Sequence, residues 1–354
     1  MFAELLTVER NELMRDLFAT YPFKPYLWAL GKEREGAADN YIVSQINEVV
    51  KAGGIARTYY LDGKVQGLCV IKPDILATQE LNCRSYRITH LIAMGKPDVQ
   101  MLVKNLLLRE TLRTLPKNSC IVARCPYSDL TSINALESCG FFTTHTALVL
   151  AKELSKNDWL ATPAEDYEVT LIDRNEIDYF DESVLNIPEG VLGWDVNLPP
   201  RVLTKVHRDW LRTYAATAPA TAVQSAASTS VNKSNGLNQA LFAAVDQGRV
   251  VGIVAERTKP DAGNALGFNV GTIDILTTAP EYRGNGVAIK LLKESLSQFV
   301  QKGVRVAELI LHTNDGFLTQ TYQEMGFFTV GTTLTLVYCG GKQPDRAKLA
   351  RIRG

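Results

Sequence analysis

The sequence predicts an α/β protein made of two copies of one unit, each with helices packed on a mixed sheet. Three observations lead to this prediction. The chain has 354 residues, enough for two domains that each bury a core. Two segments about half a chain apart share the same order of glycines and apolar residues. Within each segment, short strand-like runs alternate with amphipathic helical runs, which is typical of α/β folds.

Glycine-centred turns fix the register of the repeat. Gly63 matches Gly248 at an offset of 185, and in both places strand-like residues flank the turn, as in a β-hairpin. Further along, Gly140 matches Gly326 at an offset of 186, and two phenylalanines follow each of them. Because the offset changes by only one residue over this distance, we interpret the two segments as a tandem duplication.

Each copy continues with the same series of elements. After the hairpin come a strand, an amphipathic helix with apolar residues three and four apart, a short strand, a helix that ends at a Gly-Phe pair and a last strand. In the first copy we expect strands at residues 86–93, 119–124 and 142–150 and a helix at 99–115. In the second copy we expect strands at 270–278, 307–312 and 328–337 and a helix at 287–300.

The segments between and after the copies set the expected domain boundaries. The first domain is expected at residues 1–155 and the second at 166–340, joined by a polar linker at 156–165. Residues 215–236 are rich in Ala, Ser and Thr, and we interpret them as a flexible insertion in the second domain. Residues 341–354 form a basic tail, for which a solvated surface is the simpler interpretation and a binding element the alternative.

The composition excludes several classes of protein. Lys and Arg number 38, as do Asp and Glu, so the balance indicates neither nucleic acid nor an anionic membrane as partner. No apolar run reaches membrane-spanning length, and charged residues interrupt any signal-peptide core near the start. The six cysteines contain no CxxC pair, so we expect no metal site and no disulfide framework. A cytoplasmic protein fits these features.

A phosphate-binding turn is predicted after the strand that ends at Thr278. Pro280 stops the strand, and the run Arg-Gly-Asn-Gly-Val-Ala follows at residues 283–288. The glycines let the backbone turn and approach a ligand closely, while free N–H groups at the helix start point back at the turn. Backbone donors, the helix dipole and Arg283 favour an anion there. The motifs of a P-loop and of a dinucleotide fold are absent.

These motifs resemble those of the GNAT superfamily of acetyl-CoA-dependent N-acetyltransferases. Pro-Glu-Tyr-Arg-Gly-x-Gly-x-Ala follows a strand, and Tyr322 stands four residues before a Gly-Phe pair and a last strand. The resemblance implies two tandem GNAT-like domains, each a mixed, mostly antiparallel sheet flanked by helices. It also implies acetyl-CoA as co-substrate. The residues then expected to bind acetyl-CoA are Leu276, Thr278, Arg283, Gly284, Asn285, Gly286, Val287, Ala288 and either Asn314 or Asp315.

The resemblance further implies roles near the thioester. A bulge is expected to splay the strand ending at Thr278 from its neighbour, so that pantetheine pairs with the backbone of Leu276 and Thr278. The Leu276 N–H then stabilises the oxyanion that forms as the amine attacks in a ternary complex. Tyr322 takes the general-acid position of the family. The alternative for Tyr322 is an aromatic side chain that only packs.

The general base stays open among three candidates. Strand alternation predicts that Asp274 lies on the same face as Leu276, where its carboxylate can take a proton directly or through a water. A structural hydrogen-bond acceptor is the alternative for Asp274. His312, at the end of the neighbouring strand, is a rival base, although a structural histidine is the commoner case.

The first copy keeps the apolar frame and loses the phosphate site. Asp98 and Met101 replace the arginine and the second glycine of the turn, and Leu136 replaces the tyrosine. A methionine side chain blocks close approach of a ligand, and Asp98 is expected to cap its own helix and to repel phosphate. We therefore expect a degenerate, CoA-free first domain that serves as a scaffold or as one wall of the acceptor cleft.

The acceptor is expected to be the primary amine of a small molecule. By the resemblance it is bound between the first two strands of the second domain, where Trp194 could stack on a flat ligand and Asp195 could hold the amine. Trp210 and Tyr214, four residues apart, are expected to pack their helix on the sheet. Residues around Arg208 resemble enzymes that acetylate nucleotide-linked amino sugars. Amino-acid, thiol-precursor and peptide amines are alternative acceptors, and a non-catalytic acyl-CoA-binding or protein-interaction module is the alternative function. Nothing in the sequence predicts an oligomeric state.

Overall fold

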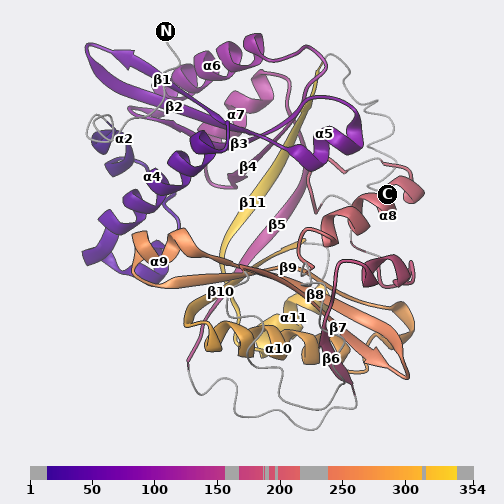
Figure 1. Cartoon of the computed structure of the whole chain (residues 1–354). Helices are drawn as coiled ribbons and strands as arrows, with labels where there is room; N and C mark the ends of the chain where they lie inside the picture. Colours follow the sequence, from indigo (N-terminus) through magenta and orange to yellow (C-terminus); the bar gives the residue numbers. More distant parts are fainter. Residues whose placement is uncertain are drawn as a thin grey trace. The chain divides into compact units, whose positions relative to one another are not determined.

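The structure is a computed structural model that describes residues 14–155, 167–185, 187, 191–195, 198–215, 238–312 and 316–340. Its contacts divide the chain into two compact units (Figure 1). Unit 1 contains Met1–Ala147, Leu192–Val196 and Gly331–Gly354. Unit 2 contains Leu148–Val191 and Asn197–Val330. No helix in the described part of the chain is long and apolar enough to cross a membrane.

Unit 1 is built on a mixed sheet with the strand order β1-β2-β3-β4-β11-β5. The pairs β1–β2, β2–β3 and β4–β11 are antiparallel, and β3 pairs parallel with β4. The strands are β1 (Ile55–Leu61), β2 (Lys64–Pro73), β3 (Ser85–Ala93), β4 (Cys120–Pro126) and parts of β5 (Phe142–Glu153) and β11 (Phe328–Cys339). Its helices are α2 (Arg15–Ala19), α3 (Leu27–Leu30), η1 (Lys32–Arg34), α4 (Glu35–Lys51), α5 (Ile75–Leu81), α6 (Pro97–Thr114) and α7 (Leu130–Ser138). One apolar core lies under α6 and α7, and another under α2 and α4.

Unit 2 repeats this plan with the strand order β5-β10-β9-β8-β7-β6. Here β9 and β10 form the parallel pair. The strands are β6 (Glu168–Leu171), β7 (Gln239–Asp246), β8 (Arg249–Lys259), β9 (Asn269–Thr278) and β10 (Val304–His312). The helices are η2 (Glu176–Tyr179), α8 (Pro200–Leu211), α9 (Pro260–Leu266), η3 (Pro280–Tyr282), α10 (Val287–Gln301) and α11 (Gly316–Glu324). α10 and α11 cover one face (Figure 1), and η2 and α8 contribute to a second core on the other.

The two hairpins have the same backbone geometry. Asp62 and Gly63 have φ of 51° and 74°, and Gln247 and Gly248 have φ of 48° and 79°. Two consecutive residues with positive φ between antiparallel strands define a type I′ turn, whose twist matches that of the strands. The predicted fold class, a mixed and mostly antiparallel sheet flanked by helices in each of two similar units, is confirmed.

Some predictions need a correction or fall outside the described residues. The predicted elements did not include α4, which precedes the repeated segment, or α5 and α9. α5 and α9 have seven residues each, too few for a clear apolar period. The predicted linker, the predicted insertion apart from Ala215, and the predicted tail lie outside the described residues. Ala215 itself is buried in the core beside α8.

Two strands pass from one unit to the other. Residues Thr333–Cys339 of β11 pair antiparallel with β4, so they group with unit 1, whereas β5 from Leu148 onward groups with unit 2. The boundaries at 155 and 166 describe the duplicated sequence and remain a prediction. These boundaries differ from those of the two compact units, because the end of β11 pairs with β4 and is therefore grouped with unit 1 although it follows unit 2 in the sequence.

Candidate active site

Unit 2 has an opening between β9 and β10. Their parallel pairing begins at Asn269 and Val304 and ends at Ile273 and Leu309. On its other edge, β9 stays paired with β8 as far as Thr278. Within the described strands, residues 274–278 of β9 therefore have no ladder partner on the side of β10.

The main-chain groups of Leu276 and Thr278 face this opening. The Ala279 N–H donates to the Val251 carbonyl at 2.9 Å, which makes the pair formed by Thr278 and its β8 partner a non-hydrogen-bonded one. Leu276, two residues earlier on β9, forms a non-hydrogen-bonded pair with Val254 in the same way. In such pairs the N–H and C=O groups point away from the partner strand. This is the geometry that the predicted contacts with pantetheine and the thioester oxygen require.

A β-bulge at Asp274 accompanies the opening. In the β8–β9 register, Ala255 faces Ile275 and Glu256 faces Ile273, so Asp274 is an extra residue on β9. A bulge bends its strand and increases the local twist, which carries β9 away from its parallel neighbour. The bulge expected from the family resemblance is present.

The Asp274 carboxylate is held by two side chains. Tyr214 Oη donates to Oδ2 at 2.8 Å, while Arg257 Nε lies 2.7 Å from Oδ2 and Arg257 Nη2 lies 3.1 Å from Oδ1. Burial and then the negative charge of Asp274 raise the pKa of Tyr214, so the phenol stays protonated and donates. The prediction that Asp274 shares a face with Leu276 is wrong, because the bulge interrupts alternation. Leu276 packs on the core under α10, and Tyr214 belongs to the core beside α8.

His312 projects from the face that carries Asp274. The odd-numbered residues 307, 309 and 311 of β10 belong to the core under α10, so alternation directs Glu308 and His312 to the other face. There Glu308 forms an ion pair with Lys259 and accepts a hydrogen bond from Thr272 Oγ1 at 3.3 Å. This face of β8, β9 and β10 thus combines carboxylates, cationic side chains and an imidazole.

Residues 283–285 of the turn are exposed, and no described side chain caps the helix that follows. Gly284 and Gly286 have φ of 82° and 84°, a conformation that side chains disfavour, and a Cβ added at either would meet no atom within 4 Å. Gly286 is the N-cap of α10, no described side chain caps this end, and the first turn holds no acidic residue. Arg283 and Asn285 are exposed, whereas Val287 is buried and fixes the helix on the core. The free amides and Arg283 together suit an anion.

Two polar contacts hold the start of this turn on the β7–β8 hairpin. Tyr282 Oη donates to Asp246 Oδ2 at 2.9 Å, and Arg249 Nη2 lies 3.1 Å from Glu281 Oε1. The hydrogen bond to Asp246 raises the pKa of Tyr282. The residues just before the predicted phosphate-binding turn are therefore held by side chains that lie outside the turn.

The first copy has helix in place of the turn. α10 begins at Val287, which corresponds to position 102 at the offset of 185, yet α6 already begins at Pro97. The Gln100 N–H donates to the Lys96 carbonyl at 2.9 Å, so this amide is used inside the helix. The prediction that Asp98 caps the helix is wrong, because Lys96 is the N-cap residue. Asp98 lies in the first turn, where its charge still disfavours an anion.

Unit 1 nevertheless keeps the bulge and the divergence of strands. In the β2–β3 register Thr89 is the extra residue, and it corresponds to Asp274 at the offset of 185. The parallel pairing of β3 with β4 ends at Ile88 and Ala123. The backbone frame of an acetyl-CoA site is therefore present in unit 1 without its phosphate turn.

The buried side chain of Lys104 lies beside this part of the backbone, and Lys104 was not among the predicted site residues. Lys104 Nζ lies 3.0 Å from Asp129 Oδ1, 2.8 Å from Thr131 Oγ1 and 2.7 Å from Ser132 Oγ. Ser132 Oγ in turn lies 2.6 Å from Asp129 Oδ2 and 3.3 Å from the Leu91 carbonyl oxygen. Leu91 is the counterpart of the predicted oxyanion donor of the second copy. Polar side chains of α6 and α7 thus reach the backbone that a cofactor would need.

Tyr322 is buried in unit 2. Its ring is 4% exposed, and it packs edge-on against Phe327 with 5.7 Å between ring centroids. Tyr322 belongs to the core that α10 covers, beside the opening strand β9. This placement agrees with packing, and the general-acid role stays a prediction.

Four predicted site residues remain, in two neighbouring pairs of the sequence. Asn314 and Asp315 lie outside the described residues. Trp194 and Asp195 group with unit 1, and their exposed fractions are 4% and 0%. Neither side chain can contact an acceptor in this conformation, because both are interior.

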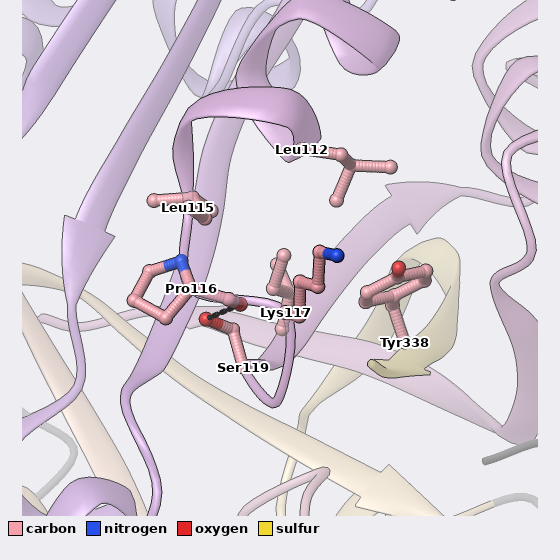
Figure 2. Close-up of a pocket in the computed structure, with 7 residues that line it drawn as sticks. Leu112, Leu115, Pro116, Lys117, Ser119 and Tyr338 are labelled. Atoms are coloured by element: carbon pink, nitrogen blue, oxygen red, sulfur yellow. Dashed lines mark hydrogen bonds between the residues drawn. The ribbon is translucent and has the colours of Figure 1, made fainter. Parts of the chain in front are cut away.

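A separate cavity of about 270 Å³ lies at the end of α6 in unit 1 (Figure 2). Figure 2 shows Tyr338 on one side, Leu115 and Pro116 on the other, and Lys117 between them. It contains none of the predicted site residues. The residues that line it are Leu112, Leu115, Pro116, Lys117, Ser119, Ile121 and Tyr338.

The comparisons with known proteins agree with this geometry. Residues 210–335 match the acetyltransferase (GNAT) domain family. A tandem GNAT protein from the clavulanic acid biosynthesis pathway is 14% identical, with a TM-score of 0.52 over 95% of this chain and 96% of that chain. A GCN5-related N-acetyltransferase from Sphaerobacter thermophilus is 14% identical, with a TM-score of 0.53 over 95% of each chain. No curated protein sequence matches detectably.

A third similar structure is part of a larger enzyme. It contains a GCN5-related glucosamine N-acetyltransferase region of a fungal multi-domain GH3 β-N-acetylglucosaminidase. The identity is 15% and the TM-score 0.53, over 93% of this chain and 36% of that chain. At such identities these structures establish the shared fold and not a shared substrate.

Residues 210–335, which include the strands β9 and β10 of this opening, carry a GNAT acetyltransferase domain. The two similar units share the fold of the tandem GNAT structure. GNAT domains generally use acetyl-CoA as the acyl donor.

Proposed function

We propose that this protein transfers an acetyl group from acetyl-CoA to the primary amine of a small molecule, by direct attack in a ternary complex in the cytoplasm. The observation that carries the proposal is the start of α10 at Gly286, which has no side-chain cap and lies next to a strand that has left its parallel neighbour. Residues 283–288 would hold the pyrophosphate through main-chain amides and Arg283. The outward main-chain groups of Leu276 and Thr278 would hold the pantetheine.

Three groups would act on the reacting atoms. Bound acetyl-CoA supplies a thioester carbonyl that an amine can attack. The Leu276 N–H would stabilise the negative charge on that carbonyl oxygen, and Tyr322 would protonate the leaving thiolate. Asp274 would take the proton of the amine, and the contacts with Tyr214 and Arg257 fix the orientation of its carboxylate. His312 is the rival base, because it projects from the same face.

The charges on this face indicate the kind of acceptor. Asp274 and Glu308 provide negative charge for an ammonium group, while Arg257, whose side chain is 43% exposed, can face an anionic group of the same molecule. We therefore propose an acceptor that carries both an amine and an anion. A nucleotide-linked amino sugar fits, and the glucosamine in the name of the fungal neighbour supports an amino sugar. Amino acids are the second choice.

A thiol-release assay tests this function. The protein is given acetyl-CoA with single members of a panel of nucleotide-linked amino sugars, free amino sugars, amino acids, polyamines and peptides. We expect thiol release with an anionic amine, and loss of turnover in Tyr322→Phe without loss of acetyl-CoA binding. Acetyl-CoA binding without turnover on any amine would instead favour the alternative, a non-catalytic acyl-CoA-binding module.

A further inference from the structure

Two cysteines of unit 1 face each other across neighbouring strands. Cys339 on β11 is the register partner of Cys120 on β4. The Gly340 N–H donates to the Ser119 carbonyl at 2.9 Å, so the two cysteines form a non-hydrogen-bonded pair of the antiparallel ladder. Such pairs have Cα atoms about 4.5 Å apart, with side chains close together. Disulfides need Cα separations of about 4.4–6.8 Å, so the backbone already permits a bond.

The two thiols differ in exposure and in acidity. Both are free, Cys120 is buried, and Cys339 is exposed. The hydrogen bond with Cys339, then burial, raises the pKa of Cys120, whereas the same hydrogen bond lowers the pKa of Cys339. An exposed thiol with a lowered pKa reacts first with an oxidant, and a buried thiol beside it is placed to resolve the product.

The side chains of this pair are turned away from the cavity of unit 1. Ser119, Ile121 and Tyr338 line that cavity and are chain neighbours of the cysteines (Figure 2). Because successive residues of a strand point to opposite faces, the two thiols lie on the face opposite the cavity. A molecule in the cavity would therefore not cover Cys339.

We propose that Cys120 and Cys339 form a reversible cross-strand disulfide, with a peroxide as the oxidant. The Cys339 thiolate attacks one peroxide oxygen, which gives a sulfenic acid and releases hydroxide. The Cys120 sulfur then attacks the Cys339 sulfur and expels hydroxide, which leaves as water with the Cys120 proton. Two thiols lose two electrons in total, and one hydrogen peroxide is reduced to two waters.

The bond would attach the last strand covalently to β4. β11 pairs with β4 over Thr333–Cys339, and the pair lies at the end of that ladder where the chain leaves the sheet. A disulfide there would prevent fraying of the strand end. Exposed disulfides are readily reduced, and Cys339 is exposed, which suits a reversible modification.

Peptide mapping of the whole protein tests the proposal. Folded protein is treated with hydrogen peroxide, alkylated, digested and analysed by mass spectrometry. We expect one cross-linked pair of peptides containing Cys120 and Cys339, lighter by two hydrogens, and its loss after dithiothreitol. Cys83→Ser is the matched control. Cys83 is close enough to raise the pKa of Cys120, but it is not the residue that faces Cys120 on β11. This variant should form the same cross-link.

Two further variants separate the proposed order of events from chance oxidation. In Cys120→Ser the resolving thiol is gone, so Cys339 should gain two oxygens as sulfinic acid. Cys339→Ser, at an exposed position, should fold normally by circular dichroism and form no cross-link. A cross-link between Cys83 and Cys120, or unmodified Cys120 and Cys339 under conditions that oxidise a free thiol peptide, would overturn the proposal.

Discussion

Ser132 Oγ lies 3.3 Å from the carbonyl oxygen of Leu91, the residue whose counterpart in the second copy is Leu276. Both copies carry the bulge and the diverging strands, so both have main-chain groups that the sheet does not pair. In unit 1 the Ser132 hydroxyl contacts one of these groups, the Leu91 carbonyl. In unit 2 the corresponding groups are the ones proposed to bind the cofactor.

Replacing Lys104 by Met should destabilise unit 1. The side chains of Lys104 and Asp129 are 2% and 3% exposed, so the variant leaves a buried carboxylate without its cation. Breaking such a pair typically costs about 3–5 kcal/mol. Hydrogen exchange of the α6 and α7 amides measures this loss locally.

Two further variants control that experiment. The double variant Lys104→Met with Asp129→Asn should recover most of the loss, because asparagine removes the charge and still caps α7. Lys205→Met breaks an exposed pair with Asp209 and should cost less than about 1 kcal/mol. A Lys104→Met protein that exchanges like the unaltered protein would refute the structural role of the network.

Glu256 should make stability depend on pH. Burial raises the pKa of Glu256 to about 7, from 4.5 for an ordinary glutamate, although Lys302 Nζ lies 3.1 Å from Oε1. The folded state therefore binds a proton more tightly than the unfolded chain. Proton binding by Glu256 contributes fully to the free energy of unfolding below pH 4.5, and this contribution is lost as the pH rises toward about 7.

The variant Glu256→Gln tests this dependence by urea unfolding between these two pH values. Its stability relative to the unaltered protein should increase with pH by roughly 1 kcal/mol per unit. Glu324→Gln, at an exposed helix position, is the control and should show no such trend. A flat difference for Glu256→Gln would mean that the carboxyl is not protonated in the folded state.

Asp274→Asn should lower kcat without weakening acetyl-CoA binding. Loss of a general base typically costs about 10²–10⁴-fold. Tyr214→Phe removes the hydrogen bond to Oδ2 but keeps the carboxylate, so its effect should be smaller. Steady-state kinetics with an active amine provides the measurement. If His312→Gln lowers kcat and Asp274→Asn does not, the imidazole is the base.

The order of the strands and helices along the chain could be predicted from the sequence, because the two copies show the same pattern independently. The hairpin turns at Gly63 and Gly248, the order of strands and the start of α10 follow from glycine positions and apolar periods. These are local signals. Alternation failed at Asp274, because a bulge adds one residue and leaves no mark in the apolar pattern.

The interior polar network of unit 1 could have been predicted in part. Lys104 lies at helical spacing from Leu107, Leu108 and Thr111, all of which are buried, so the period of α6 already places this lysine inside. Its partner Asp129 is a helix cap far along the chain. Their contact depends on tertiary packing, as does the pairing of β11 with β4, and no local pattern indicates either.

Calorimetry with coenzyme A tests the central claim most directly. We expect one site per chain, because unit 1 has helix where unit 2 has the turn. Gly286→Ala should weaken binding. Gly303→Ala is a matched control at the other end of α10, since both glycines have positive φ and no atom within 4 Å of an added Cβ. Unchanged affinity in Gly303→Ala is the predicted result. Two sites, no binding heat, or equal effects of the two variants would contradict the account.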